Sequence, residues 1–530
     1  MTAFSLSRPA LVAPVGLTAL ALLLFAPAVA VVATAAGAAG DTVLSGPAAF
    51  DYAFGTLALC ALVGVGAAFV GAGGAALVAL ADFPGRRFFS VALVTPFAVP
   101  AYIAAYAYGA MLSPVGPVAD VLSAFVGAAD AARALPEIRT LPGAAFILTL
   151  SVYPYVYLAV RASLAARSGA LLDAARSLGA SPRRAVFRVL IPAGRAAFAG
   201  GLALALMETA GDYGVADYFG VRTLSTGVFR TWYGLGDLAG AALLAAGLFV
   251  LALLFVQLEA FGRRDGADAP RTARPTPRLR LRGPQAWAAV LLCSVPVIFG
   301  FAAPVAMLIA AAPKAAAPRG LADALVNTGL AAGLGTAVTM GAAILLATAY
   351  RAAVRVRGLK SAPLDLGVRA ATLGYALPGA VVAVGVLAVA SVAPGVSIVS
   401  LGLGALLYAY ATRFVTAGYN AVAGGLEQIH PSTDEAARLL GAGPLRLFAR
   451  VHVPLARGAV AAGSAIVFID ILRELPATLL LRPFDFETAA TRVYRLASDE
   501  RFADAAAPAL FLIAIGVAAA TVLEFPDRRG

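Results

Sequence analysis

Four acidic residues lie inside otherwise apolar stretches of this chain: Glu208, Asp212, Asp470 and Glu474. A charged side chain within a membrane segment is costly, so such residues are functional candidates by default. Carboxylate and phenolate oxygens are the ligands that hard, highly charged cations prefer. Tyrosines of the first half could add oxygens, among them Tyr102, Tyr106, Tyr108, Tyr213 and Tyr218. The four acids, with Tyr102 and Tyr106, therefore form a candidate path for a cation.

Two other interpretations of these residues stay open. Tyrosines also populate membrane interfaces because their rings are amphipathic. The acids Glu208, Asp212 and Glu474 could instead pair with an arginine, Arg473 or Arg492, to hold helices together. A shift of 262 residues aligns Asp212 with Glu474, which predicts a two-fold-like pair of acids near an interface between halves. Because a path must release its ion, we expect few simultaneous ligands and no closed metal site.

Membrane helices are the elements predicted to position these residues. Hydrophobic residues make up 61% of the 530 residues, charged residues only 13%, and the mean hydropathy is +0.87. A water-soluble globule of this composition could not cover its surface, whereas about 20 apolar residues suffice for a helix to cross a bilayer. The sequence predicts twelve spans, at roughly 10–35, 53–80, 89–112, 143–161, 196–214, 238–261, 285–311, 324–350, 366–391, 398–420, 458–480 and 503–524.

A polar segment occurs twice within this apolar chain. Of the 23 residues from Asp173 to Arg195, 12 recur at 435–457 without a gap. The repeat predicts a first membrane module at 1–262 with a polar loop at 162–198, and a second module at 285–530 with a polar loop at 423–460. Between them, 263–284 is rich in Arg and Pro, as expected of a solvated linker.

The Lys and Arg residues of the loops predict the orientation. With twelve spans and the amino terminus inside, about 29 of the 40 basic residues fall on the cytoplasmic side. Both termini, the linker and both polar loops are then cytoplasmic. The alternative for the first span is a cleavable signal, since Ala28-Val29-Ala30 resembles a cleavage site. Topology accounts for the net charge of +12, so no nucleic-acid partner is expected.

Each polar loop is predicted to form two short helices around a glycine turn. Gly179 and Gly441 end the first helix, and Pro182 and Pro444 begin the second. Such a helix pair could rest on the lipid surface. It could instead dock into a soluble partner, because its small residues permit close helix approach.

The loops resemble the EAA loop of binding-protein-dependent ABC importer permeases. The resemblance rests on an acid-Ala-Ala triplet, a glycine after three further residues, and a hydrophobic-x-hydrophobic-Pro ending at Val189–Pro192 or Val451–Pro454. In that family the loop docks into the ATP-binding subunit. The resemblance implies this role for Asp173, Ala174, Ala175, Gly179, Pro192, Glu435, Ala436, Ala437, Gly441 and Pro454. Asp173 stands where the family usually has Glu, which implies asymmetric coupling.

Longer strings are similar to those of the ferric-iron importer permeases. They are Pro96–Tyr102, Met207–Gly214, Tyr218–Val221, Asp470–Thr478 and Thr491–Tyr494. The resemblance covers both halves, roughly 90–510. It implies an all-α polytopic membrane protein of two tandem six-helix, MetI-like importer permease modules, with about 12 transmembrane helices.

The resemblance also implies a mechanism and partners. A periplasmic ferric-iron-binding protein would deliver iron, and two copies of an ABC ATP-binding subunit would drive alternating access across the bacterial inner membrane, with membrane lipid around the helices. The sequence has no G-x-x-x-x-G-K-[ST] motif and no nucleophile–base set. We therefore expect that the chain is not an enzyme and carries no cofactor, with ATP bound by the partner subunit.

Alternatives exist within the class and outside it. A permease for thiamine, sulfate, molybdate or polyamine is the first, although an anionic substrate would favour arginines over acids along the path. A twelve-helix secondary transporter or a membrane scaffold is the second, although neither needs a duplicated ATPase-docking loop. Cys60 and Cys293 are expected to be core residues, and His430 and His452 lack a third ligand for a metal.

Overall fold

The structure, a computed structural model, describes residues 9–38, 42–181, 194–264, 278–315, 320–356, 362–392 and 402–524, together with Arg184 and Arg188. Nearly all of these residues are helical, and the described strands form one two-stranded sheet. The predicted all-α polytopic fold is confirmed.

Seven of the described helical runs are long and apolar enough to cross a membrane, and two helix pairs bent by 89° and 110° raise the number to nine. Twelve were predicted. The other three predicted spans correspond to helices α11 (Arg195–Gly211), α21 (Leu403–Glu427) and α27 (Phe502–Glu524). By length and composition they do not qualify; α11, for example, has 17 residues, fewer than the roughly 20 that a crossing needs.

Contacts divide the chain into two compact units, and each unit draws on both halves of the sequence. One unit comprises Met1–Val43, Thr231–Phe249 and Ala322–Ala489, and the other comprises Leu44–Arg230, Val250–Leu321 and Ala490–Gly530. We call them the first and the second unit. The predicted modules describe the order of the chain, whereas the packing exchanges segments between those modules.

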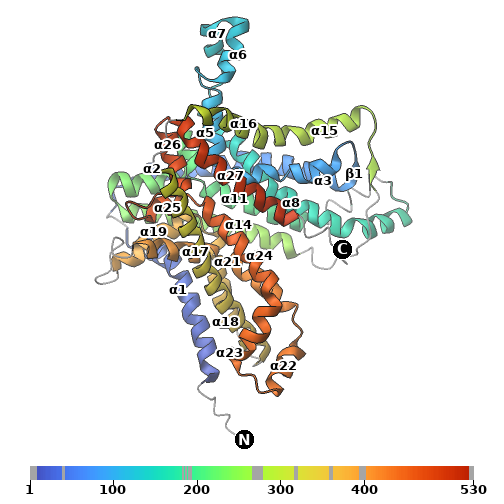
Figure 1. The fold of residues 1–530 in the computed structure, drawn as a ribbon, viewed down its shortest axis with the longest axis vertical. Helices are drawn as coiled ribbons and strands as arrows, with labels where there is room; N and C mark the ends of the chain where they lie inside the picture. Colours follow the sequence, from blue (N-terminus) through green and yellow to red (C-terminus); the bar gives the residue numbers. More distant parts are fainter. Residues whose placement is uncertain are drawn as a thin grey trace. The chain divides into compact units, whose positions relative to one another are not determined.

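The first unit is built on the long helices α17, α21 and α24. Its elements are α1 (Pro9–Gly37), α17 (Leu321–Arg351), η7 (Ala352–Val356), α18 (Ala362–Ala371), η8 (Thr372–Ala376), α19 (Gly379–Val392), α21, α22 (Pro431–Leu439), α23 (Pro444–Leu447), η9 (Phe448–His452), α24 (Val453–Arg473) and α25 (Pro476–Leu481). Helices α21 and α24 pack side by side, as Figure 1 shows.

The second unit is built around α8, against which α2, α3 and α11 pack. Its elements are α2 (Gly46–Ala67), η1 (Ala68–Ala72), α3 (Gly73–Leu80), β1 (Ala81–Asp82), α4 (Arg86–Ala92), η2 (Thr95–Ala98), α5 (Ala101–Met111), α6 (Pro117–Val126), α7 (Ala128–Ala134), α8 (Leu141–Ser177), α11, α12 (Gly214–Tyr218), α13 (Leu224–Phe229), β2 (Leu279–Arg280), α15 (Pro284–Val297), η5 (Ile298–Ala302), α16 (Ala303–Ala311), η6 (Ala312–Lys314) and α27. Figure 1 shows α6 and α7 projecting from the rest of this unit.

Four elements run across the division. They are η4 (Arg230–Gly234), α14 (Leu238–Arg264), α26 (Ala489–Ser498) and α17, whose first residue belongs to the second unit.

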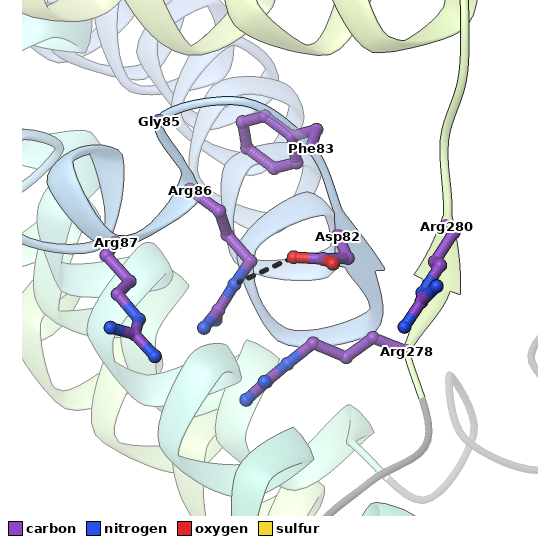
Figure 2. A pocket seen from close by; sticks show the side chains of 7 residues that line it. All are labelled: Asp82, Phe83, Gly85, Arg86, Arg87, Arg278 and Arg280. Carbon is purple, nitrogen blue, oxygen red and sulfur yellow. Dashed lines mark ion pairs between the residues drawn. The ribbon is translucent and has the colours of Figure 1, made fainter.

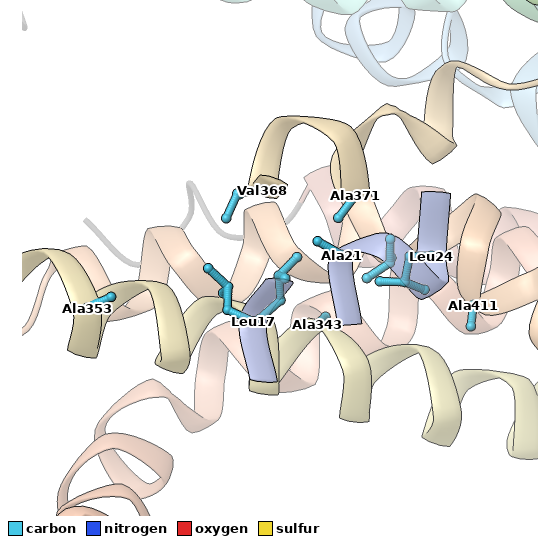
Figure 3. Packing of buried hydrophobic residues seen from close by; sticks show 10 residues of the cluster. Leu17, Ala21, Leu24, Ala343, Ala353, Val368, Ala371 and Ala411 are labelled. Atoms are coloured by element: carbon cyan, nitrogen blue, oxygen red, sulfur yellow. The ribbon is translucent and has the colours of Figure 1, made fainter. Parts of the chain in front are cut away.

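The first helix of the chain packs against the bent helix pair of the second half. Leu17, Ala21 and Leu24 of α1 are buried in one cluster with residues of α17, α18 and α21 (Figure 3). Helix α1 also contacts α19 closely, because Gly385 has no side chain and a Cβ there would overlap the carbonyl group of Pro27. Burial of this apolar surface attaches α1 to the second half of the sequence.

The second unit shows the reciprocal exchange. The first helical run of the second half, α15–η5–α16, contacts η2 and α5 of the first half. Gly300 of η5 permits this approach, since a Cβ there would lie 2.9 Å from Cβ of Pro96. Each half therefore packs its first helical run against the bent third span of the other half.

We predict that Gly385→Ala lowers the free energy of unfolding by about 1–3 kcal/mol, because the added methyl group forces α1 and α19 apart. The measurement is the fraction of purified protein that stays monodisperse in size-exclusion chromatography after heating. Gly424→Ala is the matched control, since Gly424 lies in α21 with nothing within 4 Å of an added Cβ. Equal heat resistance of the two variants would contradict the close approach.

Candidate functional site

Glu474 lies between two helices, and its carboxylate caps the second of them. It follows α24 and precedes α25. Its carboxylate accepts hydrogen bonds from the backbone N–H groups of Ala477 and Thr478, each at 2.9 Å, and from the Thr478 hydroxyl at 2.7 Å. The guanidinium of Arg413 on α21 pairs with it at 2.8 Å. The carboxylate thus caps α25 and fixes it to α21.

Asp212 occupies the matching position in the second unit. It follows α11, and its Oδ1 accepts hydrogen bonds from the N–H groups of Val215 at 2.9 Å and Ala216 at 3.3 Å. The short helix α12 begins there. Residues that align in the repeat therefore share one structural role, since a carboxylate satisfies backbone donors that an interrupted helix leaves without partners.

The ion pairs differ from those considered in the sequence. Glu474 pairs with Arg413, whereas Arg473 pairs with Asp470 of its own helix at 3.5 Å. Glu208 is half-buried on α11, one turn before Asp212. Because Asp212 and Glu474 belong to different compact units, their two-fold-like pairing stays a prediction.

A group of phenol and carboxylate oxygens lies close to Asp212. The hydroxyl of Tyr213 is 2.8 Å from the hydroxyl of Tyr494, which donates a hydrogen bond of 2.8 Å to Oδ2 of Asp217. All three residues belong to the second unit. We call them the oxygen cluster.

Asp217 was not among the residues predicted from the sequence to line the cation path. The available signal was the Asp-Tyr pair, which occurs at Asp212-Tyr213 and again at Asp217-Tyr218. The two aspartates are five positions apart, and α12 turns Asp217 toward Tyr494, a residue 277 positions later in the chain. Only the tertiary fold brings that tyrosine to the site.

Tyr102 and Tyr106, the two tyrosines predicted to line the cation path, are packed beside this cluster. Tyr102 and Tyr106 of α5 are both buried, with their ring centroids 6.3 Å apart. The Tyr106 ring meets that of Tyr218 edge to face at 4.6 Å, and the Arg139 guanidinium lies 4.7 Å from the Tyr218 centroid. The rings of Tyr102 and Tyr106 thus pack as an aromatic pair beside the oxygen cluster.

The oxygen cluster provides one type of potential metal ligand. Carboxylate and phenol oxygens suit hard cations. The described residues contain no group of three or more His, Cys, Asp or Glu that could hold a metal ion.

The second polar loop folds as α22, a turn and α23, as predicted. Gly441 lies in the turn with φ of 78°, a left-handed conformation that favours glycine. Leu439 and Leu440 before it are 90% and 87% exposed, and Glu435 is exposed as well. Pro454 is exposed at the start of α24. The loop therefore presents apolar side chains and an acid outward.

The first polar loop differs in how it is joined to the membrane helix. Helix α8 runs without a break from Leu141 to Ser177, so that Asp173–Ala175 belong to the same helix as the span. Gly179 has φ of 77°, and Leu178 is 88% exposed. Pro192 and the side chains of Asp173, Ala174 and Ala175 lie outside the described residues.

A buried ionic cluster holds the second polar loop in place. Asp434 of α22 accepts hydrogen bonds from Nε of Arg351 at 3.1 Å and from Nε2 of His452 at 2.9 Å. Arg351 also donates to the backbone carbonyls of Leu426 and Ile429. Asp434, Arg351 and His452 are all under 10% exposed. This cluster, which the sequence did not reveal, joins α17, α21, α22 and η9.

The charge of Asp434 is stabilised by its partners. Burial opposes ionisation of the carboxyl, but the hydrogen bonds from His452 and Arg351 outweigh it and hold the pKa of Asp434 below its usual value. His452 therefore has a role beyond the loop turn, as a partner of a buried carboxylate.

Comparison with known proteins gives a family and several relatives. The chain matches the family described as binding-protein-dependent transport system inner membrane component over residues 70–264 and 365–529. It is 26% identical over 468 residues to the Fe(3+)-transport system permease protein FbpB 2 of Haemophilus influenzae, covering 86% of each chain. A probable sulfate transport system permease protein cysT of Nephroselmis olivacea is 31% identical over 133 residues, which are 25% of this chain and 44% of that protein.

Among solved structures, a chain of a bacterial alginate ABC transporter in complex with an alginate pentasaccharide-bound periplasmic protein aligns with a TM-score of 0.35 and 17% identity. The alignment covers 46% of this chain and 94% of that one.

We predict that Asp434→Asn lowers the free energy of unfolding by about 3–5 kcal/mol, because Arg351 keeps its charge in a buried site without a counter-charge. Heat resistance at pH 7, followed by size-exclusion chromatography, measures the loss. In the unchanged protein this contribution is present at neutral pH and declines as the pH falls below about 5, since the pKa is depressed in the folded state. Asp485→Asn, at an exposed position, should change stability by at most about 0.5 kcal/mol. An equal effect of the two substitutions would refute the anchoring role.

Proposed function

We propose a specific transport function from one established premise: the chain belongs to the family of binding-protein-dependent transport system inner membrane components. Its resemblance to ABC importer permeases is thereby confirmed, and it is a multi-pass membrane permease. We infer that it moves ferric iron. The observation that carries this inference is the similarity to an Fe(3+)-transport system permease protein over 86% of both chains.

The oxygen cluster supports a ferric substrate. Tyr213, Tyr494 and Asp217 offer two phenol oxygens and a carboxylate within one hydrogen-bonded chain. Oxygen donors of this type suit a hard trivalent cation. Because transport requires release of the ion, we expect it to bind few of these oxygens at a time.

The helix-capping acids support the same proposal in another way. Asp212 fixes α12, which carries Asp217, and Glu474 fixes α25. Their carboxylates are engaged with backbone donors, so we assign them to positioning the path more than to binding the ion. Asp470 is paired with the side chain of Arg473, so we assign contact with the substrate to Glu208 among the predicted acids.

The polar loops support coupling to a separate ATPase. We infer that two copies of an ABC ATP-binding subunit bind the loops around Gly179 and Gly441, and that ATP-driven closure produces alternating access. A periplasmic ferric-iron-binding protein would deliver the substrate. In this proposal the chain lies in the bacterial inner membrane with both termini in the cytoplasm, carries no cofactor and hydrolyses no ATP itself.

Sulfate is the alternative substrate that a comparison favours, since two probable sulfate permeases match 25% of this chain. An anion would require basic groups or helix amino termini at the site. Asp217 and the neighbouring phenols provide acceptors and weak donors, which argues for a cation. Thiamine, molybdate and polyamine permeases, and a secondary transporter, are outcomes that the transport experiment below separates.

We predict that Asp217→Asn and Tyr494→Phe each lower the initial rate of radiolabelled ferric iron uptake about ten-fold, because each removes an oxygen contact or its charge. The assay uses cells that lack this permease and other iron importers and that produce each variant. Unlabelled thiamine, sulfate or putrescine in excess should leave iron uptake unchanged.

Tyr52→Phe is the matched control, since Tyr52 lies on α2, which contributes no residue to the oxygen cluster, and it should transport normally. Ferric specificity would be refuted if the unchanged chain restored no iron uptake, or if sulfate or thiamine suppressed that uptake. The family assignment would remain intact in either case.

We predict that a double Gly179→Glu, Gly441→Glu variant reduces uptake to less than about a tenth, because a bulky acid blocks close approach of the ATPase subunit. Copurification of the ATP-binding subunit with the tagged permease should fall in parallel.

The Asn double variant controls for the backbone. Asn adopts the left-handed conformation of both glycines more readily than other residues, and an added Cβ meets nothing within 4 Å at either position. Gly179→Asn with Gly441→Asn should therefore keep most transport. Normal transport by the Glu variant would exclude docking at these turns.

A further inference from the structure

A recess lined by arginines lies in the second unit, where the linker between the sequence halves meets the end of α3. Figure 2 shows Arg86 and Arg87 from the start of α4 and Arg278 and Arg280 from the linker around it, with Asp82 between them. Its volume of about 580 Å³ is within the range of roughly 300–1,000 Å³ for small-molecule sites.

The backbone brings these arginines together from segments almost 200 residues apart. Strand β1 pairs in parallel with β2, so that Asp82 lies opposite Arg280. The N–H of Leu281 donates a hydrogen bond of 3.0 Å to the carbonyl of Asp82 and extends the pairing. Gly85, with φ of 75°, then reverses the chain before α4. The linker arginines are therefore held at a fixed site beside the membrane helices.

Positive charge is in excess at this site. The Asp82 carboxylate lies 3.8 Å from Nε of Arg86, and it is the only acid among the described lining residues. Arg86 is further fixed by donating to the carbonyl of Val78 at 3.2 Å. Arg87, Arg278 and Arg280 are exposed toward solvent. Four guanidiniums with one carboxylate repel one another, and a bound anion would relieve that repulsion.

The position selects the kind of anion. The linker is predicted from charge to lie on the cytoplasmic side, and β1–β2 pairing places the loop after α3 beside it. The recess adjoins the ends of α3, α4 and α15, three runs of candidate membrane spans. Guanidinium groups bind phosphate oxygens in bidentate geometry. Basic pockets at the cytoplasmic ends of membrane helices suit lipid headgroups.

We propose that this recess binds a phosphoryl anion, with the headgroup of an acidic phospholipid as its source. The site depends on the linker and not on the oxygen cluster. The proposal of a phosphoryl site is therefore independent of the proposal of ferric transport. A bound headgroup would hold the linker strand against α3 and thereby tie the two sequence halves together at the membrane surface.

The test compares the purified full chain with Arg278→Gln/Arg280→Gln. Native mass spectrometry measures binding of phosphatidic acid, with diacylglycerol as the lipid that lacks a phosphoryl group. The variant should bind phosphatidic acid at least about five-fold more weakly, and none of the proteins should bind diacylglycerol in the same manner. Arg369→Gln/Arg457→Gln removes two exposed charges elsewhere and should bind as the unchanged chain does.

Added inorganic phosphate distinguishes the two sources. If millimolar phosphate leaves lipid binding unchanged, the occupant is the lipid headgroup; if it displaces the lipid, a soluble phosphate compound shares the site, and both results support a phosphoryl site. Equal phosphatidic acid binding by all three proteins, or no binding by any, overturns the proposal. Arg278→Lys/Arg280→Lys should retain most binding, and Arg87→Gln provides a second test if the Gln pair does not fold.

Discussion

Backbone hydrogen bonding in a medium without water is the constraint on which this structure depends. A helix interrupted inside a membrane leaves backbone donors that lipid cannot satisfy. Asp212 and Glu474 supply acceptors where α11 and α24 end, and the short helices α12 and α25 begin on them. These two acids, which suggested a cation path in the sequence, therefore make the non-helical turns after α11 and α24 possible. Arg413 offsets the charge of Glu474 within the same unit.

The exchange of first helices links the two halves of the sequence. Helix α1 is buried against α18 and α19, and α15–η5–α16 packs against η2 and α5. In lipid, close packing of small residues drives helix association, and Gly385 and Gly300 provide it at the two contacts. Neither half can complete its core alone. In the proposed importer, a movement of one half would therefore also move segments of the other.

The two polar loops are alike in sequence but are held differently. In the second loop the buried Asp434 and His452 anchor α22 to Arg351. The repeat places Leu172 and Leu190 at the corresponding positions of the first loop, so that copy cannot form the same ionic anchor. Its polar helix instead continues directly from the membrane span of α8. In the proposed importer, the two ATPase subunits would thus act on unequal levers.

The sequence by itself determined the membrane class, the duplication, the helix–turn–helix of the second loop and the family, because hydropathy, an ungapped repeat and local turn residues act over short stretches of chain. It also located Asp212 and Glu474, as charges in apolar segments. Only the tertiary structure decided the partnership of Arg413 with Glu474 and the meeting of Asp217 with Tyr494. These depend on contacts between residues tens to hundreds of positions apart, which no local pattern encodes. The exchange of first helices belongs to the same class, since the close approach of α1 at Pro27 meets Gly385 of the other half.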